Sequence, residues 1–358
     1  MSTVEESAEE QGEDALESTI EEHVRNKHRK ARSCRSGPDP IARVIWRGMA
    51  DKQLKFRVAG PWVHPARRLP LLSSRALFEQ ANSKGLPGMT PHLKFSSPNP
   101  ELWADRSVTF EPEILTLLPK RDEALQYGTC AVVGNSGRLV NARHGAEIDA
   151  HDAVFRINYA PVHGFTEHVG SKTTFDVVNS AHARFMIGKH RESKFISRHG
   201  KERNSTVLVF EVMKNDIRRK IFPSLLEKWG GEGRRPDTRP GGGLPPVALM
   251  SPHLVVHAQW LFSYLNQLIK AAAPRREYAT KAMTGWYATF FALQVCERVN
   301  VYGFSPFTPH EGHWHGKYHY FDDNSAAQSH SFDLAYDILS IISSWPCTDA
   351  KFDMHLDN

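Results

Sequence analysis

The stretch Cys130-Ala-Val-Val-Gly-Asn-Ser-Gly137 decides the fold class of this 358-residue chain. Its apolar, β-branched residues predict a buried strand, and the Gly-Asn-Ser-Gly that follows predicts a turn. Glycines let the backbone approach a ligand, while Asn135 and Ser136 offer neutral hydrogen-bonding groups to phosphate or ribose oxygens. The turn lacks the third glycine of the dinucleotide fingerprint and the Gly-Lys-Ser/Thr of a P-loop. A plain strand-to-helix turn is the alternative interpretation.

Further strands and helices are predicted downstream of this stretch. Strand-like runs lie at 152–158, 173–179, 207–212 and 299–304, and helical stretches lie at 254–272 and 284–297. This alternation predicts an α/β fold with a mostly parallel twisted sheet flanked by helices. Ligands of such sheets bind beyond the carboxyl ends of the strands, where Asn135, Asn158 and Asn179 would lie. For each asparagine, a helix or turn cap is the alternative role.

Two segments carry a family resemblance. The first runs from Cys130 through Arg156-Ile-Asn158 to Thr174, and the second runs from Thr284-Gly285 through Cys296 to Phe304. They resemble the large and small sialyl motifs of the animal-type sialyltransferases, which include plant and algal relatives. The resemblance implies a single Rossmann-like domain, a variant of the GT-A fold. It also implies that Asn135, Ser136, Asn158, Thr284 and Gly285 contact the nucleotide-sugar donor.

Two later segments resemble the remaining family motifs. Lys317-Tyr318-His319-Tyr320 is similar to the third motif, and His330-Ser-Phe-Asp-Leu-Ala335 is similar to the last. The resemblance implies that His330 is the general base, that His319 assists the phosphate, and that Tyr320 contacts the donor. The family glutamate is replaced by Ala335. On a helix that starts at His330, Asp333 would share its face and support the base, although a solvated helix charge is the alternative.

The resemblance implies an inverting glycosyltransferase that moves sialic acid, or a related keto-sugar, from a CMP-sugar to a glycan hydroxyl. The expected acceptor ends in galactose and belongs to a glycoprotein, glycolipid or polysaccharide. A histidine base and neutral donors suit one direct displacement. Two alternatives stay open: a CMP-Kdo-type donor, and a non-catalytic relative that only binds a CMP-sugar. The second is motivated by Ala335 and by Ala282-Met283, which replace a proline and a hydroxyl residue of the small motif.

Metal chemistry is not expected. The chain contains no Asp-x-Asp, the usual metal–phosphate bridge of other glycosyltransferases. A histidine-rich stretch, with His310, His313, His315 and His319, resembles a metal site in composition. Its spacing and the glycines at 312 and 316 favour a loop over a helical metal motif. The sequence therefore predicts a metal-independent enzyme in which the CMP-sugar is a co-substrate.

Charge and composition divide the chain. The net charge of +5, from 45 Lys+Arg and 40 Asp+Glu, is modest and predicts no nucleic-acid partner, although a basic arm is the alternative. Residues 5–22 are acidic, residues 25–35 are basic, and both are poor in apolar side chains. Residues 1–55 are therefore predicted to be a flexible tail or stem, and 56–358 the catalytic domain. The Gly-, Pro- and Arg-rich stretch 230–246 is predicted to be a loop on the acceptor side.

The cysteines bear on the compartment. In a cytosolic protein Cys130 and Cys296 would be ordinary buried thiols. The resemblance implies instead that they form a disulfide between the two motifs, which favours the oxidising lumen of the Golgi. Cys34 and Cys347 stay unassigned, and Asn204-Ser-Thr206 is a possible glycosylation acceptor. Family members are usually anchored by one apolar helix, but no run of 18 apolar residues occurs here. We therefore expect a truncated chain or unusual targeting.

Overall fold

The computed structural model describes most of the region from residue 40 onward. The described residues are 40–51, 55–82, 92–97, 104–188, 205–229, 246–273, 279, 281–306, 316–326, 330–344 and 351–355. Several predictions fall outside these ranges: the charged blocks of the tail, His310, His313, His315, Cys34, Cys347, Asn204 and nearly all of 230–246.

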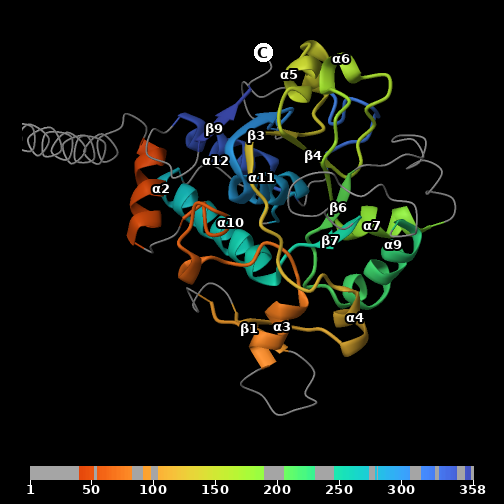
Figure 1. Cartoon of the computed structure of the whole chain (residues 1–358). Coiled ribbons are helices and arrows are strands. Elements are labelled where there is room, and N and C mark those ends of the chain that lie inside the picture. Colours follow the sequence, from red (N-terminus) through yellow and green to blue (C-terminus); the bar gives the residue numbers. More distant parts are fainter. Residues whose placement is uncertain are drawn as a thin grey trace, which may run out of the picture.

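A seven-stranded parallel sheet forms the centre of the molecule, as the sequence predicts (Figure 1). The strand order is β7-β6-β5-β4-β3-β8-β9, and each neighbouring pair is parallel. The strands are β3 (Tyr127–Val133), β4 (Ala153–Ile157), β5 (Phe175–Val178), β6 (Thr206–Val209), β7 (Val247–Leu249), β8 (Cys296–Tyr302) and β9 (Lys351–Met354). The two outermost strands were not predicted, because they are short and carry little periodicity of their own.

Helices cover both faces of the sheet, and a separate antiparallel pair of strands, β1 (His92–Phe95) and β2 (Arg106–Thr109), lies apart from it. The longer helices are α2 (Pro40–Asp51), α3 (Arg75–Asn82), α7 (Ser180–Ile187), α9 (Phe222–Trp229), α10 (Pro252–Ala272), α11 (Thr284–Val295) and α12 (Phe332–Ser344). The shorter turns are η1 (Pro65–Arg67), α4 (Pro112–Leu117), η2 (Gly137–Asn141), α5 (Gly145–Asp149), α6 (Thr166–Val169) and η3 (Ile217–Ile221).

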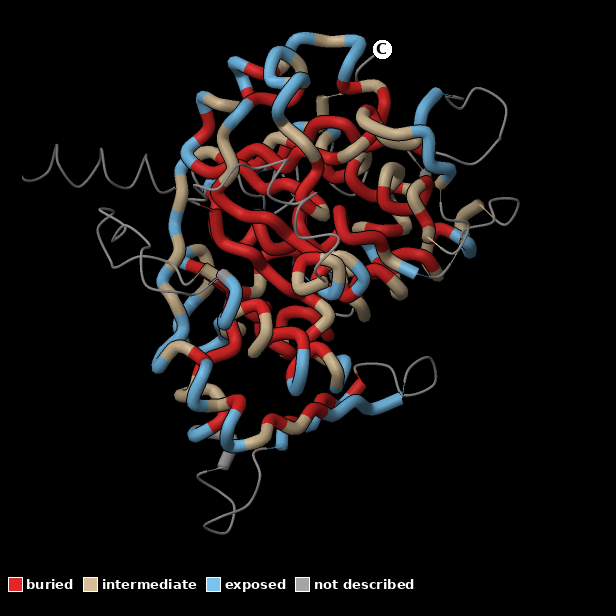
Figure 2. The backbone as a smooth tube through the Cα atoms, turned by 90° about the vertical axis from the view of Figure 1, so that its right-hand side faces the viewer, coloured by how far each residue is buried: buried red, intermediate tan, exposed pale blue. Residues whose placement is uncertain are grey.

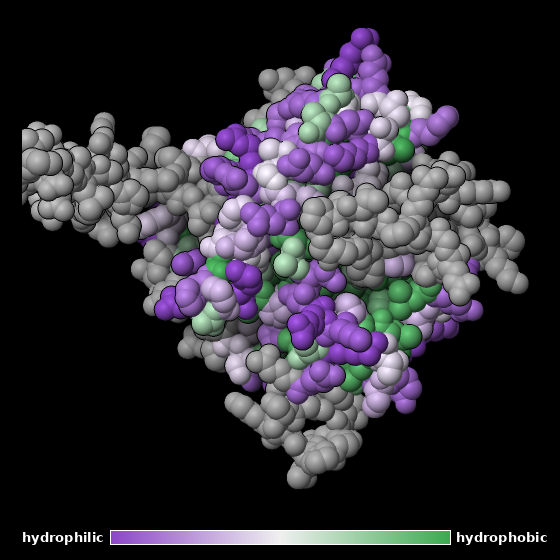
Figure 3. Space-filling view, in the orientation of Figure 1, coloured by the Kyte–Doolittle hydropathy of each residue, from purple (hydrophilic) through white to green (hydrophobic). Residues whose placement is uncertain are grey.

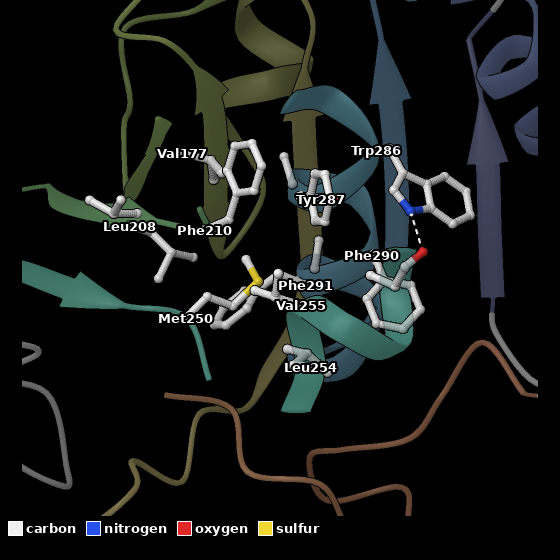
Figure 4. Close-up of a cluster of buried hydrophobic side chains, with 14 of the residues drawn as sticks. Val177, Leu208, Phe210, Met250, Leu254, Val255, Trp286, Tyr287, Phe290 and Phe291 are labelled. Carbon is white, nitrogen blue, oxygen red and sulfur yellow. Dashed lines mark hydrogen bonds between the residues drawn. The ribbon is translucent and has the colours of Figure 1, made fainter. Parts of the chain in front are cut away.

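The helix α11 is the centre of the larger core. Every residue of α11 is buried, as expected for a helix that is apolar on all sides. It packs against β3, β4 and β5 on one side and α10 on the other. Trp286 donates its indole N–H to the carbonyl oxygen of Ala258 in α10 at 3.0 Å, so its polar atom is satisfied within the core (Figure 4). Figure 2 shows that buried backbone gathers in the middle of the molecule and that more exposed segments surround it.

The opposite face of the sheet has a smaller core. Successive side chains of a strand point to opposite faces, so Cys130 and Val132 of β3 join the larger cluster while Ala131 and Val133 join the smaller one. The smaller cluster also contains Tyr302, at the end of β8, and residues of η2, α5 and α6. The turn segments that follow β3 and β4 are thereby fixed to the back of the sheet.

The N-terminal part of the described chain is packed onto this body. Within the segment 1–55, which is predicted to be a tail, α2 lies against α10, and Tyr264 donates its hydroxyl to the Gly48 carbonyl at 3.2 Å. The helix α2 therefore belongs to the folded part of the chain, although it lies within the segment predicted to be a tail. Two apolar side chains of α2, Ala42 and Ile45, are buried.

The buried amide of Gln294 fixes the next segment. Its oxygen accepts the N–H groups of Val58 and Ala59 at 2.8 and 3.0 Å, and its nitrogen donates to the carbonyls of Phe56 and Phe290, both at 2.8 Å. A Cβ atom on Gly60 would lie 1.8 Å from the Gln294 carbonyl oxygen, and the φ of this residue is +72°. Only glycine fits this close approach.

The face of the described part that is seen in Figure 3 is mainly hydrophilic. Among all described residues, the exposed large hydrophobic side chains are Leu117 and Val140, at 42% and 40%. Among the described helices, none combines the length and apolar character that crossing a bilayer requires.

The predicted Cys130–Cys296 disulfide is present, with Cα atoms 6.0 Å apart. Because it closes a loop of 166 residues between two central strands, we expect the Cys130→Ala/Cys296→Ala variant to lose roughly 4–5 kcal/mol of unfolding free energy. Urea unfolding under oxidising conditions measures this. An unchanged urea midpoint in this variant would contradict the prediction.

Candidate active site

A cleft of about 240 Å³ opens at the carboxyl edge of the central strands. It is built by the turns that follow β3, β4, β5 and β8, by the start of α11, and by the segment before α12. Its lining is Gly134, Asn135, Ser136, Ile157, Asn158, Asn179, His182, Met283, Thr284, Gly285, Gly303, Phe304, Ser305, Tyr318, His319, His330 and Phe332. Among the described residues, this lining consists of amides, hydroxyls, imidazoles and apolar groups, without a carboxylate.

The turn after β3 is held by the turn after β8. The N–H of Gly134 donates to the Tyr302 carbonyl at 2.8 Å, and the N–H of Ser136 donates to the Gly303 carbonyl at 3.1 Å, so sheet pairing continues past the strand ends. A Cβ atom on Gly134 would lie 2.3 Å from the Gly303 oxygen. Glycine is therefore required where the two turns cross.

The two polar side chains of this turn differ in how they are used. Ser136 caps η2 by accepting the Arg138 N–H at 3.2 Å, and its hydroxyl lies 2.8 Å from that of Ser305. Asn135 donates its side-chain amide to the Ile157 carbonyl at 3.3 Å. The side-chain oxygen of Asn135 is buried and has no hydrogen-bond partner among the described residues. It is the acceptor that a donor group of a ligand in the cleft would satisfy.

Asn158 and Asn179 form the next part of the wall. Asn158 follows β4 with a φ of +54°, a left-handed conformation that asparagine tolerates better than most residues. Its side-chain oxygen accepts the backbone N–H of Asn179 at 3.2 Å. Asn179 caps α7 by accepting the N–H of His182 at 2.9 Å. The helix-cap role considered for Asn179 is thus confirmed, and the cap brings His182 to the cleft.

Thr284 and Gly285 lie at the first turn of α11, where the positive end of the helix dipole faces the cleft. The hydroxyl of Thr284 lies 3.5 Å from the Asn179 amide nitrogen. A Cβ atom on Gly285 would lie 2.7 Å from the ring of Phe304. The start of the helix is therefore packed closely against the turn after β8.

The third-motif segment divides its side chains between the cleft and the smaller core. Tyr318 and His319 line the cleft with their rings stacked 4.1 Å apart, and His319 Nδ1 lies 2.9 Å from an Asp322 oxygen. Burial and the charge of Asp322 raise the pKa of Tyr318 to about 12, so its phenol stays protonated. The Asp322 carboxylate sets the orientation of the His319 ring.

Tyr320 does not line the cleft, contrary to the prediction that it contacts the donor. Its side chain is buried in the smaller core, where its hydroxyl donates to the Pro161 carbonyl at 2.6 Å. Its contribution near the cleft is structural, because its backbone N–H donates to the Asn135 carbonyl at 2.9 Å.

His330 also lines the cleft. It pairs with Lys281 in an isolated β-bridge two residues before α12 begins. Burial lowers the pKa of His330, the ammonium of Lys281 lowers it further, and the backbone carbonyls of Ala282 and Lys281 partly oppose these effects. Its Nδ1 has no hydrogen-bond partner among the described residues. At neutral pH the ring is therefore an uncharged imidazole with a nitrogen that can accept a proton.

The shared helical face predicted for His330 and Asp333 is wrong. The helix α12 begins at Phe332, so His330 precedes it and the three-residue spacing does not align the two side chains. Asp333 is buried in the first turn of α12 and does not line the cleft.

A second hollow of about 410 Å³ adjoins the cleft. The two share Asn179, Thr284 and His330, so His330 lies where they meet. The full lining of the second hollow is Arg106, Asn179, Ser180, Ala181, Phe210, Glu211, Met213, Lys214, Val255, Gln259, Phe262, Ser263, Lys281, Ala282, Thr284, Tyr287 and His330. Its polar walls and its stacked pair of Phe210 and Tyr287, with ring centres 4.2 Å apart, combine hydrogen-bonding groups with an aromatic surface.

Glu211 is a site residue that the sequence did not indicate. It follows β6, accepts the Ser180 N–H at 2.5 Å, and pairs with the Lys214 ammonium at 2.5 Å. Burial alone would raise the pKa of Glu211, but these partners outweigh it and lower the pKa. Its negative charge acts on His330 by raising the pKa of the imidazole. Its position just after β6 could have indicated it, because the carboxyl end of β6 lies at the same edge of the sheet as the predicted asparagines.

Comparisons with known proteins all point to the same family. The profile of glycosyltransferase family 29 (sialyltransferase) matches residues 101–344. A CMP-N-acetylneuraminate-beta-galactosamide-alpha-2,3-sialyltransferase 1 of Gallus gallus is 27% identical over 250 residues, which cover 65% of this chain and 62% of that protein. The sialyltransferase-like protein 2 of Arabidopsis thaliana is 30% identical over 180 residues, which cover 50% of this chain and 30% of that protein.

The matches cover less than two thirds of the length of these relatives. Among solved structures, a mammalian sialyltransferase is similar with a TM-score of 0.41 and 20% identity, over 82% of this chain and 83% of that chain.

We expect His330 to titrate below 6.5, because burial and the Lys281 charge both disfavour the imidazolium. NMR of the protein with labelled histidine rings measures this, and the His330→Gln variant assigns the resonance. Lys281→Met should raise the titration midpoint, because it removes the repelling charge and keeps the backbone carbonyl. A midpoint above 6.5 in the wild type would contradict this environment for His330.

Proposed function

Because this chain belongs to glycosyltransferase family 29, the sialyltransferases, we propose that it transfers sialic acid from CMP-sialic acid to a glycan hydroxyl with inversion. One observation carries the proposal within this molecule. A cleft lined by neutral hydrogen-bonding groups and a second, more polar hollow meet at one uncharged histidine. A donor in the first and an acceptor in the second would place the acceptor hydroxyl beside a base.

The donor would occupy the cleft. Negative charge grows on the phosphate of a CMP-sugar as the anomeric bond breaks, and preorganised dipoles stabilise that charge. The starts of α7 and α11 point their positive ends to the cleft, and Asn135, Asn158 and Thr284 add amide and hydroxyl groups. His319, oriented by Asp322, is the group we assign to the leaving phosphate. Ser136 and Gly285 would shape the wall, since both are engaged in contacts within the protein.

The acceptor would occupy the second hollow. Its stacked Phe210 and Tyr287 offer an aromatic surface of the kind that packs on a sugar ring. Arg106 and Gln259, hydrogen-bonded to each other at 2.7 Å, offer partners to sugar hydroxyls. The Gallus gallus relative is named for a β-galactosamide acceptor. We therefore propose a galactose-terminated acceptor on a glycoprotein, glycolipid or polysaccharide.

His330 would take the proton of the attacking hydroxyl. The lowered pKa keeps its ring uncharged before the reaction, as a base requires. Proton transfer produces an imidazolium, and a nearby negative charge stabilises it. Glu211, whose charge already raises the pKa of His330, lies on the wall of the acceptor hollow and is better placed for this role than Asp333.

We propose that the transfer itself needs no metal, with the CMP-sugar as co-substrate. The support is the lining of the cleft, which consists of neutral groups and histidines among the described residues. We also propose the Golgi lumen as the site of action. The Cys130–Cys296 disulfide supports an oxidising compartment.

The donor sugar and the activity have alternatives that one experiment separates. CMP-Kdo shares the CMP group, and Ala335 together with Ala282-Met283 departs from the family motifs. Released CMP is measured for CMP-sialic acid and CMP-Kdo, each with and without a galactose-terminated acceptor. Acceptor-dependent release from CMP-sialic acid supports the proposal, while release from CMP-Kdo alone changes the donor. Binding of both donors without release would make the protein a non-catalytic relative.

The first prediction concerns the donor cleft. We expect Asn158→Gly to weaken CMP binding by about 1–3 kcal/mol, because the amide is lost from a partly buried polar site. Glycine is the better replacement than alanine, since residue 158 has a positive φ. Calorimetry with CMP measures the change, and Asn141→Gly, an exposed asparagine outside the cleft, is the matched control. Wild-type affinity in Asn158→Gly would remove Asn158 from the donor site.

The second prediction concerns the base. We expect His330→Ala to lower turnover by at least about 10²-fold while CMP binding stays nearly intact. Glu211→Gln should lower turnover and also shift the pH profile downward, because the charge that raises the pKa of His330 is removed. Asp333→Asn is the comparison, with the smallest loss of the three. Wild-type turnover in His330→Ala would refute the mechanism.

The third prediction concerns metals. We expect EDTA to leave the initial rate of acceptor-dependent CMP release unchanged at a temperature well below the melting transition. The rate is measured immediately after metal removal, with and without added manganese. Loss of activity that manganese restores would contradict metal-independent transfer.

A further inference from the structure

Two histidines and a glutamate meet on the back of the sheet, away from both hollows. His144 directly precedes α5, Glu147 lies within α5, and His355 directly follows β9. His144 Nδ1 lies 3.2 Å from one oxygen of Glu147, and His355 Nε2 lies 3.6 Å from the other. One ligand atom from each of the three side chains lies within 4.8 Å of the other two. Among the described residues, this is the one cluster of this kind.

The ring of Tyr302 holds the three side chains in place. Its hydroxyl donates to Glu147 Oε1 at 2.8 Å, which orients the carboxylate. The His355 ring stacks on Tyr302 with centres 4.2 Å apart and planes inclined by 16°, and the His144 ring lies 5.4 Å from it. The backbone N–H of His355 also donates to the Val301 carbonyl at 2.9 Å. The cluster is thus supported by a buried residue at the end of a central strand, in the way that outer partners orient metal ligands.

The spacing and exposure suit a small divalent cation. Ligand atoms about 2.0–2.2 Å from a tetrahedral zinc ion are about 3.3–3.6 Å from one another. The two histidine nitrogens lie 3.2 and 3.6 Å from the nearer oxygens of Glu147, which is close to that range. The side chains of His144, Glu147 and His355 are 21%, 46% and 28% exposed, so a cation has access and a water molecule has room as the fourth ligand.

We propose that His144 Nδ1, the Glu147 carboxylate and His355 Nε2 bind a Zn²⁺ ion. Two imidazoles and one carboxylate are a ligand set that zinc prefers. The ion would join the segment after η2 to the segment after β9, across the carboxyl end of β8. The residue after Tyr302 is Gly303, which lines the cleft, so the ion would steady the cleft wall from behind. It would contact neither hollow and would take no part in transfer.

The test is titration of the metal-free full chain with zinc chloride, followed by calorimetry and by thermal unfolding. The wild type should bind one zinc ion more per chain than His355→Gln or His144→Gln, and zinc should raise the melting temperature of the wild type but not of these two variants. Tyr302→Phe keeps the ligands and should bind this ion about 10–100-fold more weakly, as for loss of an outer partner. Circular dichroism checks that each variant is folded, and the two ligand variants serve as alternatives for each other.

Two controls separate this site from other histidines. The His310→Gln/His313→Gln/His315→Gln variant removes the histidine-rich stretch and should keep the ion. His163→Gln replaces an exposed histidine outside the cluster and should also keep it. Equal zinc binding by the wild type, His144→Gln and His355→Gln would overturn the proposal, and so would loss of the ion from the variant that lacks the histidine-rich stretch. The cluster would then be a hydrogen-bonded group without a metal.

Discussion

The parallel pairing of β3 with β8 is the constraint on which the rest of the structure depends. These strands are distant in sequence, and the Cys130–Cys296 disulfide joins them covalently. The pairing does not stop at the strand ends, because Gly134 and Ser136 continue to donate to Tyr302 and Gly303. The shape of the turn after β3 is therefore set by the neighbouring strand, and the sheet fixes the positions of its polar side chains.

In a parallel sheet the carboxyl ends of all strands lie at the same edge, even when the strands are far apart in sequence. Each central strand delivers one polar residue to the same edge: Asn135 after β3, Asn158 after β4, Asn179 after β5 and Glu211 after β6. The helix α11 runs back from that edge through the core, so its first turn closes the cleft. Residues spread over about two hundred positions of the sequence are thus brought to one site, because each follows a strand that ends at the same edge of the sheet.

This arrangement of strand ends explains which features could be predicted from the sequence. The parallel sheet, the buried helix of the second motif and the edge positions of Asn135, Asn158 and Asn179 all follow from strands and helices with clear patterns, whereas the place of Thr284 was implied by the family resemblance. The disulfide was implied by the family resemblance and not by spacing. The roles predicted for Tyr320 and Asp333 differ from the structure for local reasons. The Tyr320 hydroxyl donates to the Pro161 carbonyl, and α12 starts two residues after His330. Glu211 and the cluster around Tyr302 depend on tertiary packing, which leaves no signal in a short window of sequence.

The buried amide of Gln294 has a consequence for handling the protein. Since α11 runs from the cleft to the opposite edge of the sheet, Gln294 lies near the strand starts, and so do the backbone groups of Phe56, Val58 and Ala59 that it binds. The polypeptide is therefore secured to the sheet on the side that faces away from the cleft. Coupling the protein to a surface through residues on that side would leave the cleft open to solution, which suits binding measurements with large ligands.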